Sequence, residues 1–302
     1  MTRRKWRSKS PAKSIPIESD IQPGDVVSVD QLVSPASGLV AQMTGILTTR
    51  RYKYATVFVD QASRLGYVHL QKTADVEETV YGKRAFEEYM RSIGVQVRSY
   101  QADNGVFRAN KWQEECQNKR QRLTFTGVNA HHQNGHAERR IRELQDTARS
   151  MLLHAGKKWP KCVTTNLWPY AIKMASDVFN NSPCFQHEGA KTPLQIASRT
   201  DVQVNKKHYH PFGCPIYVLE SDLQVGKPFG KWERRSNIGI YIGQSPNHNK
   251  QVALVLNRKT GLVSSQYHVL FDDDFSLVKQ DDLDSEWMIK AGFVTRVEEE
   301  RR

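Results

Sequence analysis

The spacing of apolar residues between positions 25 and 127 is the feature that most constrains the fold of this chain. Apolar residues there recur first at every second position, which is typical of strands, and later at every third or fourth position, which is typical of helices. The strand-like segments are 25–32, 44–49, 54–60, 65–71, 95–100 and 122–127, and helices are predicted over 76–92 and near 111–118. Consecutive strands followed by alternating helices and strands indicate an α/β protein built on a mixed sheet.

Three carboxylates stand at informative points in this pattern. Asp30 lies at the end of the first strand segment, and Asp103 follows the segment 95–100, just before the turn pair Asn104-Gly105. Glu138 lies in the first turns of a further helix, whose apolar stripe is Ile141, Leu144, Ala148, Met151 and Leu152. Carboxylates are hard oxygen ligands that suit Mg²⁺, and two such ions about 4 Å apart hold the attacking and leaving oxygens of a phosphoryl transfer. The three acids therefore point to strand chemistry on nucleic acid.

The same residues resemble the motifs of a known family. The series Asp30, Asp103-Asn104-Gly105 and Asn134-Gly135-His136-Ala137-Glu138-Arg139 resembles the acid triad of retroviral and LTR-retrotransposon integrases, most closely the copia type. Segments 212–218 and 231–275 are similar to further copia-type signatures, so the resemblance covers roughly residues 15–275. It implies a ribonuclease-H-like integrase core, in which the first and fourth strands are neighbours, followed by a small β-barrel.

The resemblance also implies a reaction and a set of site residues. The expected activity is DNA integration, in which metal-dependent 3′-end processing of retrotransposon DNA precedes its strand transfer into target DNA. Asp30, Asp103 and Glu138 are the expected catalytic residues and would hold two Mg²⁺ or Mn²⁺ ions, with Asp30 on both. The residues expected to contact DNA are Asn104, Gln133, Asn134, Gly135, His136, Arg139, Arg142 and Arg149. For the arginines, the alternative is ion pairing with Glu143 and Asp146 on the same helix.

Two other functions remain open at this point. A ribonuclease-H-like nuclease would need an acid from its first helix, a role open to Glu77, Glu78, Glu87 and Glu88. A decayed or domesticated copy would act only as a non-catalytic DNA-binding protein. Asp60 is the acid most easily mistaken for a ligand, because it also ends a strand. Its position at a hairpin near Arg64 predicts a turn or ion-pair role instead.

The charge of the chain favours a polyanionic partner. Lys and Arg outnumber Asp and Glu by 44 to 32, a formal net charge of +12, and a basic surface gains affinity by releasing counterions from nucleic acid. The expected partners are element ends and target DNA, bound by a homo-oligomer. We expect no membrane partner, because no long apolar span is present, and no zinc, because the four cysteines form no Cys-x-x-Cys pair.

We expect four parts in the chain. The resemblance implies an integrase catalytic core (21–200) and a small β-barrel domain (211–276), and the charge pattern predicts a basic disordered arm before them (1–20) and a charged C-terminal tail after them (277–302). The first 13 residues include six basic residues and no acid, a pattern typical of a nuclear import signal or of an arm that contacts nucleic acid. We therefore expect a nuclear location, with a cytoplasmic particle stage. The start of the chain resembles the linker that precedes copia-type cores, which suggests a piece of a longer polyprotein.

Overall fold

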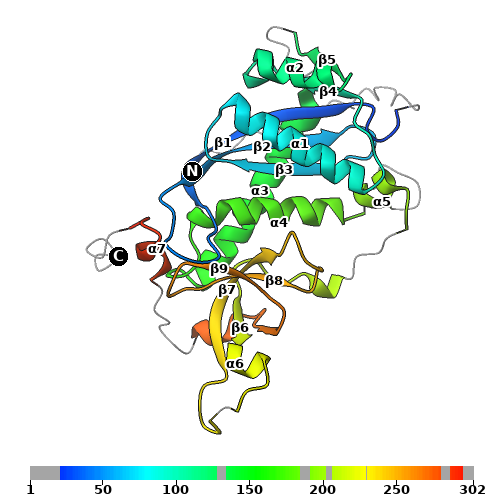
Figure 1. Ribbon diagram of the computed structural model, residues 1–302. Coiled ribbons are helices and arrows are strands. Elements are labelled where there is room, and N and C mark those ends of the chain that lie inside the picture. Colours follow the sequence, from blue (N-terminus) through cyan, green and yellow to red (C-terminus); the bar gives the residue numbers. More distant parts are fainter. Residues whose placement is uncertain are drawn as a thin grey trace, which may run out of the picture.

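The computed structural model describes residues 21–127, 134–183, 191–201, 206–228, 230–279 and 286–294. These residues form two modules, each built on a five-stranded sheet, that lie one above the other in Figure 1. Gln133, one of the residues expected to contact DNA, lies outside the described residues.

The first sheet has the strand order β3-β2-β1-β4-β5. Its strands are β1 (Val27–Leu39), β2 (Arg51–Asp60), β3 (Gly66–Gln71), β4 (Ser99–Ala102) and β5 (Arg122–Phe125). The first three strands are antiparallel, while β4 and β5 run parallel to β1. The first and fourth strands are thus neighbours, and the predicted ribonuclease-H-like mixed sheet is confirmed.

The longest strand differs from the sequence prediction. Segment 44–49 is a loop, with the side chain of Ile46 95% exposed, whereas β1 continues through Pro35 to Leu39. A register shift between Val33 and Gly38 accommodates the residues that locally favour a turn. Gly38 is required there, because a Cβ atom would lie 2.4 Å from Cγ of Pro169. Packing against a distant helix therefore overrides the local signal.

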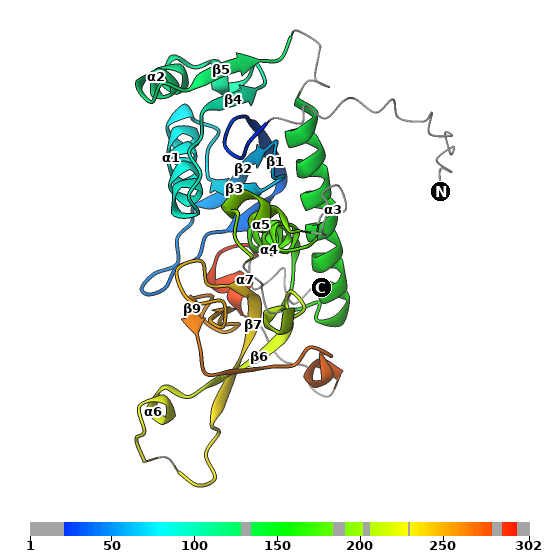
Figure 2. The ribbon, with the colours of Figure 1, turned by 90° about the vertical axis from the view of Figure 1, so that its right-hand side faces the viewer.

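Helices cover both faces of the first sheet (Figure 2). On one face lie α1 (Val76–Ser92) and α2 (Asn110–Asn118), and on the other lie α3 (Gly135–Lys158) and α4 (Trp168–Asn180). Alternate residues of β2 supply the two cores: Phe58 packs with α1 and α2, while Val57 and Val59 belong to the cluster that includes α3 and α4. The short elements are η1 (Val106–Arg108), η3 (Thr165–Leu167), α5 (Pro193–Ser198), η4 (Lys206–His208), α6 (Ser221–Gln224), η5 (Ser276–Lys279) and α7 (Trp287–Lys290).

The second sheet is antiparallel and has the order β10-β6-β7-β8-β9. Its strands are β6 (Pro215–Leu219), β7 (Ser236–Gln244), β8 (Ala253–Leu256), β9 (Val263–Gln266) and β10 (Val269–Phe271). The segment predicted as one strand from 262 to 271 is two, because the chain leaves β8 after Gln266 and crosses to pair with β6. Within the described residues the sheet stays open, with the short β9 and β10 at its edges, where a closed barrel was predicted.

The two modules share one hydrophobic core. A single cluster of buried residues includes Val57 of the first sheet, Leu144 of α3 and Ile240 of the second sheet. The indole Nε1 of Trp287 donates a hydrogen bond of 2.9 Å to the carbonyl of Cys162, which ties the C-terminal helix to the α3–α4 connection. None of the described helices is both long and apolar enough to span a bilayer.

Candidate active site where β4 ends beside β1

The register of the first sheet brings two of the three predicted acids together. β1 and β4 are parallel, with Val29 opposite Ala102, so the residues that follow these two, Asp30 and Asp103, lie side by side. Both side chains are half-buried. Oδ1 of Asp103 accepts a hydrogen bond of 3.0 Å from the amide of Gly105, which closes the turn predicted at Asn104-Gly105. Oδ1 of Asp30 accepts one of 2.7 Å from the amide of Gln31.

An asparagine holds the start of α3 against the same strand. Nδ2 of Asn134, the residue before α3, donates a hydrogen bond of 3.0 Å to the carbonyl of Val29, next to Asp30. Asn134 is only 2% exposed, so this contact is shielded from water. Glu138 follows one helical turn later and is half-buried. The helix that bears the third acid is therefore attached to β1 beside Asp30, although sequence reasoning gave Asn134 a role in DNA contact only. Asp30 itself does not end its strand as predicted, because β1 continues to Leu39.

The three acids converge by backbone position but do not form a closed ligand set. Within the described part of the chain, no three Asp, Glu, His or Cys side chains lie close enough to hold a metal ion. Three neighbouring carboxylates repel one another when no cation is bound, which favours such a spread arrangement.

The surroundings of the acids nevertheless fit an oxygen-liganded cation. Asn104 and Asn134 each have a buried amide oxygen with no hydrogen-bond partner among the described residues. The amide group of Asn104 is held in place by its Nδ2, which donates to the carbonyl of Thr126 at 3.1 Å. Buried polar atoms without partners are rare, and a bound water or ion would supply the missing partner. Carboxylate and amide oxygens are also the ligands that Mg²⁺ and Mn²⁺ prefer.

His136 is engaged with the protein. Its Nδ1 accepts a hydrogen bond from the guanidinium of Arg64. Burial and, to a smaller extent, the charges of Arg64 and Arg139 lower the pKa of His136 to about 4. The imidazole is therefore neutral at pH 7. Gly135 opens α3 with open space where a Cβ atom would lie.

The predicted arginines of α3 divide into paired and unpaired side chains. Arg139 forms an ion pair of 2.8 Å with Glu143, and Arg149 forms one of 2.7 Å with Asp146. For these two arginines the structure therefore shows ion pairing on the same helix, the alternative to DNA contact that the sequence left open. Arg142 is exposed and has no ion pair within the described residues. Arg140, which sequence reasoning passed over, is 8% exposed and donates to the carbonyl of Arg64 at 3.0 Å.

The other acids considered from the sequence have separate partners. Asp60 accepts hydrogen bonds from the amides of Gly24 and Ser63 and from the Ser63 hydroxyl, so its predicted turn role is confirmed. Burial raises the pKa of Asp60, against the effect of these hydrogen bonds. It pairs in register with Val27, at the opposite end of this strand segment from Asp30.

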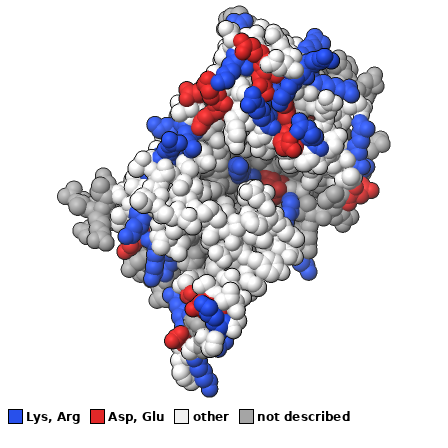
Figure 3. Space-filling view, in the orientation of Figure 1, with Lys and Arg blue, Asp and Glu red and all other residues white. Residues whose placement is uncertain are grey.

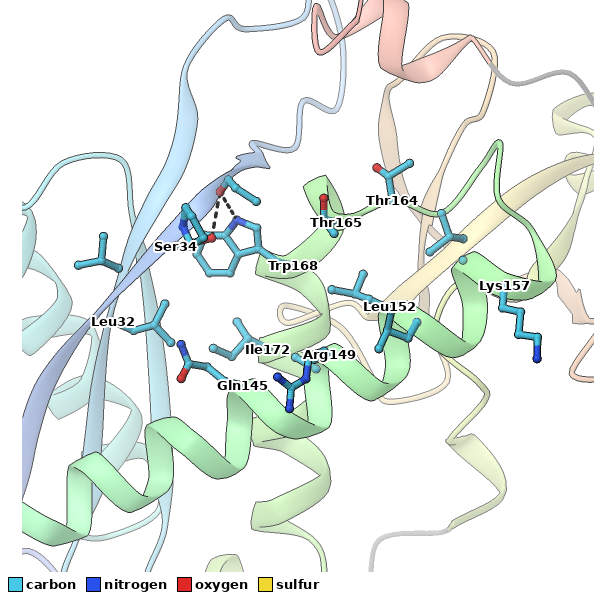
Figure 4. Close-up of a pocket in the computed structure, with 17 residues that line it drawn as sticks. Leu32, Ser34, Gln145, Arg149, Leu152, Lys157, Thr164, Thr165, Trp168 and Ile172 are labelled. Atoms are coloured by element: carbon cyan, nitrogen blue, oxygen red, sulfur yellow. Dashed lines mark hydrogen bonds between the residues drawn. The ribbon is translucent and has the colours of Figure 1, made fainter. Parts of the chain in front are cut away.

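A pocket of about 570 Å³ lies farther along α3, beyond the acids (Figure 4). It is bounded by Leu32 and its neighbours on β1, by Leu152 of α3, and by Trp168 and Ile172 of α4, and it is mainly apolar. Nε1 of Trp168 is used internally, because it donates to the carbonyl of Ala36 at 2.9 Å. Asp30, Asp103 and Glu138 do not line this pocket, so it is separate from the candidate active site.

Comparison with known proteins identifies relatives among transposon and retroviral proteins. The chain is 32% identical over 172 residues to the retrovirus-related Pol polyprotein from transposon TNT 1-94 of Nicotiana tabacum; the match covers 55% of this chain and 12% of the polyprotein. No protein-family model matches the chain.

Solved integrase structures give more distant matches. The catalytic core domain of HTLV-2 integrase, in complex with magnesium, matches at 19% identity with a TM-score of 0.40, over 59% of this chain and 98% of that domain. The simian T-cell lymphotropic virus intasome, in complex with the PP2A regulatory subunit B56 gamma, matches at 14% identity with a TM-score of 0.42, over 83% of this chain and 79% of that one. These scores are too low for residue roles to be transferred. The Pol polyprotein confirms the resemblance recognised in the motifs.

Proposed function

We propose that this chain, an integrase-like protein with a ribonuclease-H-like fold, inserts the DNA of a copia-type LTR retrotransposon into target DNA. The reaction has two phosphoryl transfers. In the first, water attacks a phosphodiester near the 3′ end of the element and releases the terminal nucleotides. In the second, the exposed 3′-hydroxyl attacks a phosphodiester of the target, whose own 3′-oxygen leaves.

The observation that supports the proposal best is the meeting of Asp30, Asp103 and the start of α3 where the pairing of β1 with β4 ends. The strand register aligns the two aspartates, and the hydrogen bond from Asn134 to Val29 anchors the helix that bears Glu138. Carboxylates brought to one region of the fold repel one another when no cation is bound. A shared ligand offsets that repulsion.

Asp30, Asp103 and Glu138 are the residues that would hold two Mg²⁺ or Mn²⁺ ions. Such ions act as Lewis acids and stabilise the charge that develops during phosphoryl transfer. The chain itself supplies the positioning. The turn closed by Gly105 orients Asp103, and Arg142 offers an unpaired positive charge one turn beyond Glu138 for the DNA backbone.

The ribonuclease H alternative is weakened by the occupation of its candidate acids. Glu87 is buried in a network with Lys83 and Tyr100, and Glu78 accepts from the amides of Lys72 and Thr73. Glu77 and Glu88 are ion-paired with Lys111 and Arg91. A fourth acid from α1 would have to break one of these contacts. The non-catalytic alternative, a DNA-binding protein only, is separated by the experiment below.

The proposal includes assembly and location. A homo-oligomer on paired element ends and target DNA, acting in the nucleus after a cytoplasmic particle stage, is the arrangement that integration requires. The net charge of +12 favours DNA as the partner.

The test uses three substitutions that remove charge and keep shape: Asp30→Asn, Asp103→Asn and Glu138→Gln. Strand transfer from an oligonucleotide end into a plasmid, with Mn²⁺ present, should fall by more than about 100-fold in each, since even residues behind the ligands of a metal change activity by 10–100-fold. Asp146→Asn, which removes an exposed acid from the same helix, is the matched control and should retain activity. Circular dichroism should remain unchanged throughout.

Metal binding gives a second measurement that does not depend on activity. Calorimetric titration with Mn²⁺ should detect binding to the parent protein and to Asp146→Asn, and weaker binding to the three triad variants. Activity in any triad variant equal to that of the parent would remove that residue from the site. Cleavage of RNA–DNA hybrids without strand transfer would favour the nuclease, and Mn²⁺ binding without either activity would favour the non-catalytic protein.

A further inference from the structure

The connection between β2 and β3, residues 61–65, is fixed at both of its ends, and we call it the hairpin turn. Where the turn begins, the amide of Gln61 donates to the carbonyl of Val26 at 3.0 Å. Where it ends, the side chain of Asn180 on α4 accepts from the amide of Gly66 at 2.8 Å and donates to the carbonyl of Gly66 at 2.7 Å. The turn therefore offers its side chains from a rigid support.

Gln61 joins the two strands that lead to the aspartates. Its Nε2 donates to Oγ of Ser28 at 2.9 Å and to Oε1 of Gln101 at 2.8 Å. Ser28 lies two residues before Asp30, on the same face of β1. Gln101 lies two residues before Asp103, near the end of β4. One amide group therefore spans β1 and β4 directly behind both acids.

Arg64 reaches the helix that bears the third acid. Its guanidinium donates to Nδ1 of His136, which precedes Glu138 by two residues. The backbone carbonyl of Arg64 accepts from Nη2 of Arg140 at 3.0 Å, and Arg140 follows Glu138 by two residues. One residue of the hairpin turn thus holds the first turns of α3 on both sides of Glu138 in the sequence.

The contact between Arg64 and His136 differs from the ion pairs on the surface of the first module. Figure 3 shows Lys and Arg beside Asp and Glu there, and the exposed Arg84 and Arg91 both pair with glutamates. The contact of Arg64 with a neutral imidazole gains no charge pairing. Arg64 also has a φ of 65°, which residues other than glycine rarely adopt. Such costly conformations persist where the surrounding structure fixes them, and they gather at functional sites.

We propose that Gln61 and Arg64 are positioning residues of the candidate active site. Gln61 sets the separation of Asp30 from Asp103. Arg64 holds Glu138 in place relative to both. Carboxylates without a cation repel one another, so their alignment depends on groups behind them, as is general for the ligands of a metal. This inference rests on the proposed function, and neither residue touches DNA or metal in it.

Amide hydrogen exchange without metal tests the contact of Arg64. Arg64→Asn removes the guanidinium, and Asn tolerates a positive φ. Exchange at residues 139–142, the first amides of α3 with partners inside the helix, should become about 10-fold faster, the factor for one hydrogen bond from a charged group. Arg64→Lys keeps a donor and should restore part of the protection. Arg120→Asn is the matched control, because Arg120 is exposed and has a φ of 53°, and it should exchange like the parent.

A second variant tests the bridge between the strands. Gln61→Met keeps the length of the side chain and removes both hydrogen bonds, so exchange at residues 99–102 of β4 should also become about 10-fold faster. Gln117→Met, which replaces an exposed glutamine of α2, is its control. A purely structural role would instead lower the free energy of urea unfolding and increase exchange throughout the first sheet.

Functional measurements show whether these contacts align the acids. Titration with Mn²⁺ should give about 10- to 100-fold weaker binding in Arg64→Asn and Gln61→Met, the range for residues that support metal ligands. Strand transfer at saturating DNA should fall by a similar factor, while the DNA concentration for half-maximal rate stays unchanged. Combining Arg64→Asn with His136→Gln should cost no more than the worse single variant, because both break the same contact.

The outcomes distinguish this inference from the proposed function. If the triad variants lose Mn²⁺ binding and strand transfer while Arg64→Asn and Gln61→Met keep both, the inference is overturned and the proposed function stands. If the parent protein shows neither Mn²⁺ binding nor strand transfer, the proposed function is rejected, and local exchange still decides whether the hairpin turn supports α3 and β4. Unchanged exchange in both variants, or equal losses in the two controls, would overturn the inference whatever the activity.

Discussion

The buried ion pair between Lys83 and Glu87 of α1 makes an asymmetric prediction about stability. The two side chains are 0% and 6% exposed and lie 2.7 Å apart. Glu87 has three further partners: it accepts from the Tyr100 hydroxyl at 2.9 Å, from Lys119 at 2.5 Å and from Gln121 at 2.9 Å. Lys83 has one further hydrogen-bond partner, since its Nζ donates to Oε1 of Gln121 at 2.7 Å, and the same Nζ lies 5.1 Å from the centroid of the Tyr100 ring. Removing the charge of Glu87 therefore leaves Lys83 with few partners, whereas removing the charge of Lys83 leaves Glu87 with several.

Glu87→Gln should lower the free energy of unfolding by about 3–5 kcal/mol, because it leaves a fully buried ammonium without a counter-charge. Lys83→Met should cost only about 1–2 kcal/mol, since Glu87 keeps Lys119 and two hydrogen-bond donors, and Met fills a similar volume. The double variant should be more stable than Glu87→Gln alone, because no unpaired charge remains. Urea unfolding at pH 7, followed by circular dichroism, measures all three. A loss of under 1 kcal/mol in Glu87→Gln, or a larger loss in Lys83→Met, would refute the reasoning.

Two further predictions concern the helix that bears Glu138. The pKa of His136 is lowered to about 4, so the unfolded state binds more protons between pH 4 and 6.5 and the free energy of unfolding should fall as the pH drops through this window. His136→Gln should reduce this pH dependence in urea unfolding. An unchanged pH dependence would assign it to His69, whose pKa is also about 4. Arg142→Ala should reduce the log–log salt dependence of duplex binding by about 0.9 units, whereas Arg139→Ala should change it less, because Arg139 is already paired with Glu143. Equal effects of the two substitutions would contradict the division of the α3 arginines into paired and unpaired side chains.

Local patterns predicted much of the core, and long-range contacts explain the rest. Helix α1 begins and ends at the predicted residues, because Val80, Phe86 and Met90 recur at helical spacing on its buried face. The neighbouring positions of Asp30 and Asp103 followed from the strand arrangement of the ribonuclease-H-like fold that the motifs resemble. In contrast, the extension of β1 through Gly38 depends on packing against Pro169, and the break between β9 and β10 depends on pairing with β6.

The same distinction applies to individual site residues. The hydrogen bond between Asn134 and Val29 joins residues 105 positions apart, and no local sequence pattern near either residue predicts it. Lys83 and Glu87 have the spacing of an ordinary surface pair on a helix, and only the arrival of Tyr100 and Gln121 buries them. Trp232 would be assigned to a core on residue type alone, whereas the structure leaves it exposed.

The shared core of the two modules has a mechanical consequence. Because residues of both sheets and of α3 belong to one packed cluster, and packed interiors resist deformation, we expect the second sheet to move together with the helix that bears Glu138 rather than to swing about a hinge. Mutations that loosen this cluster should therefore disturb the acids even though they replace no site residue.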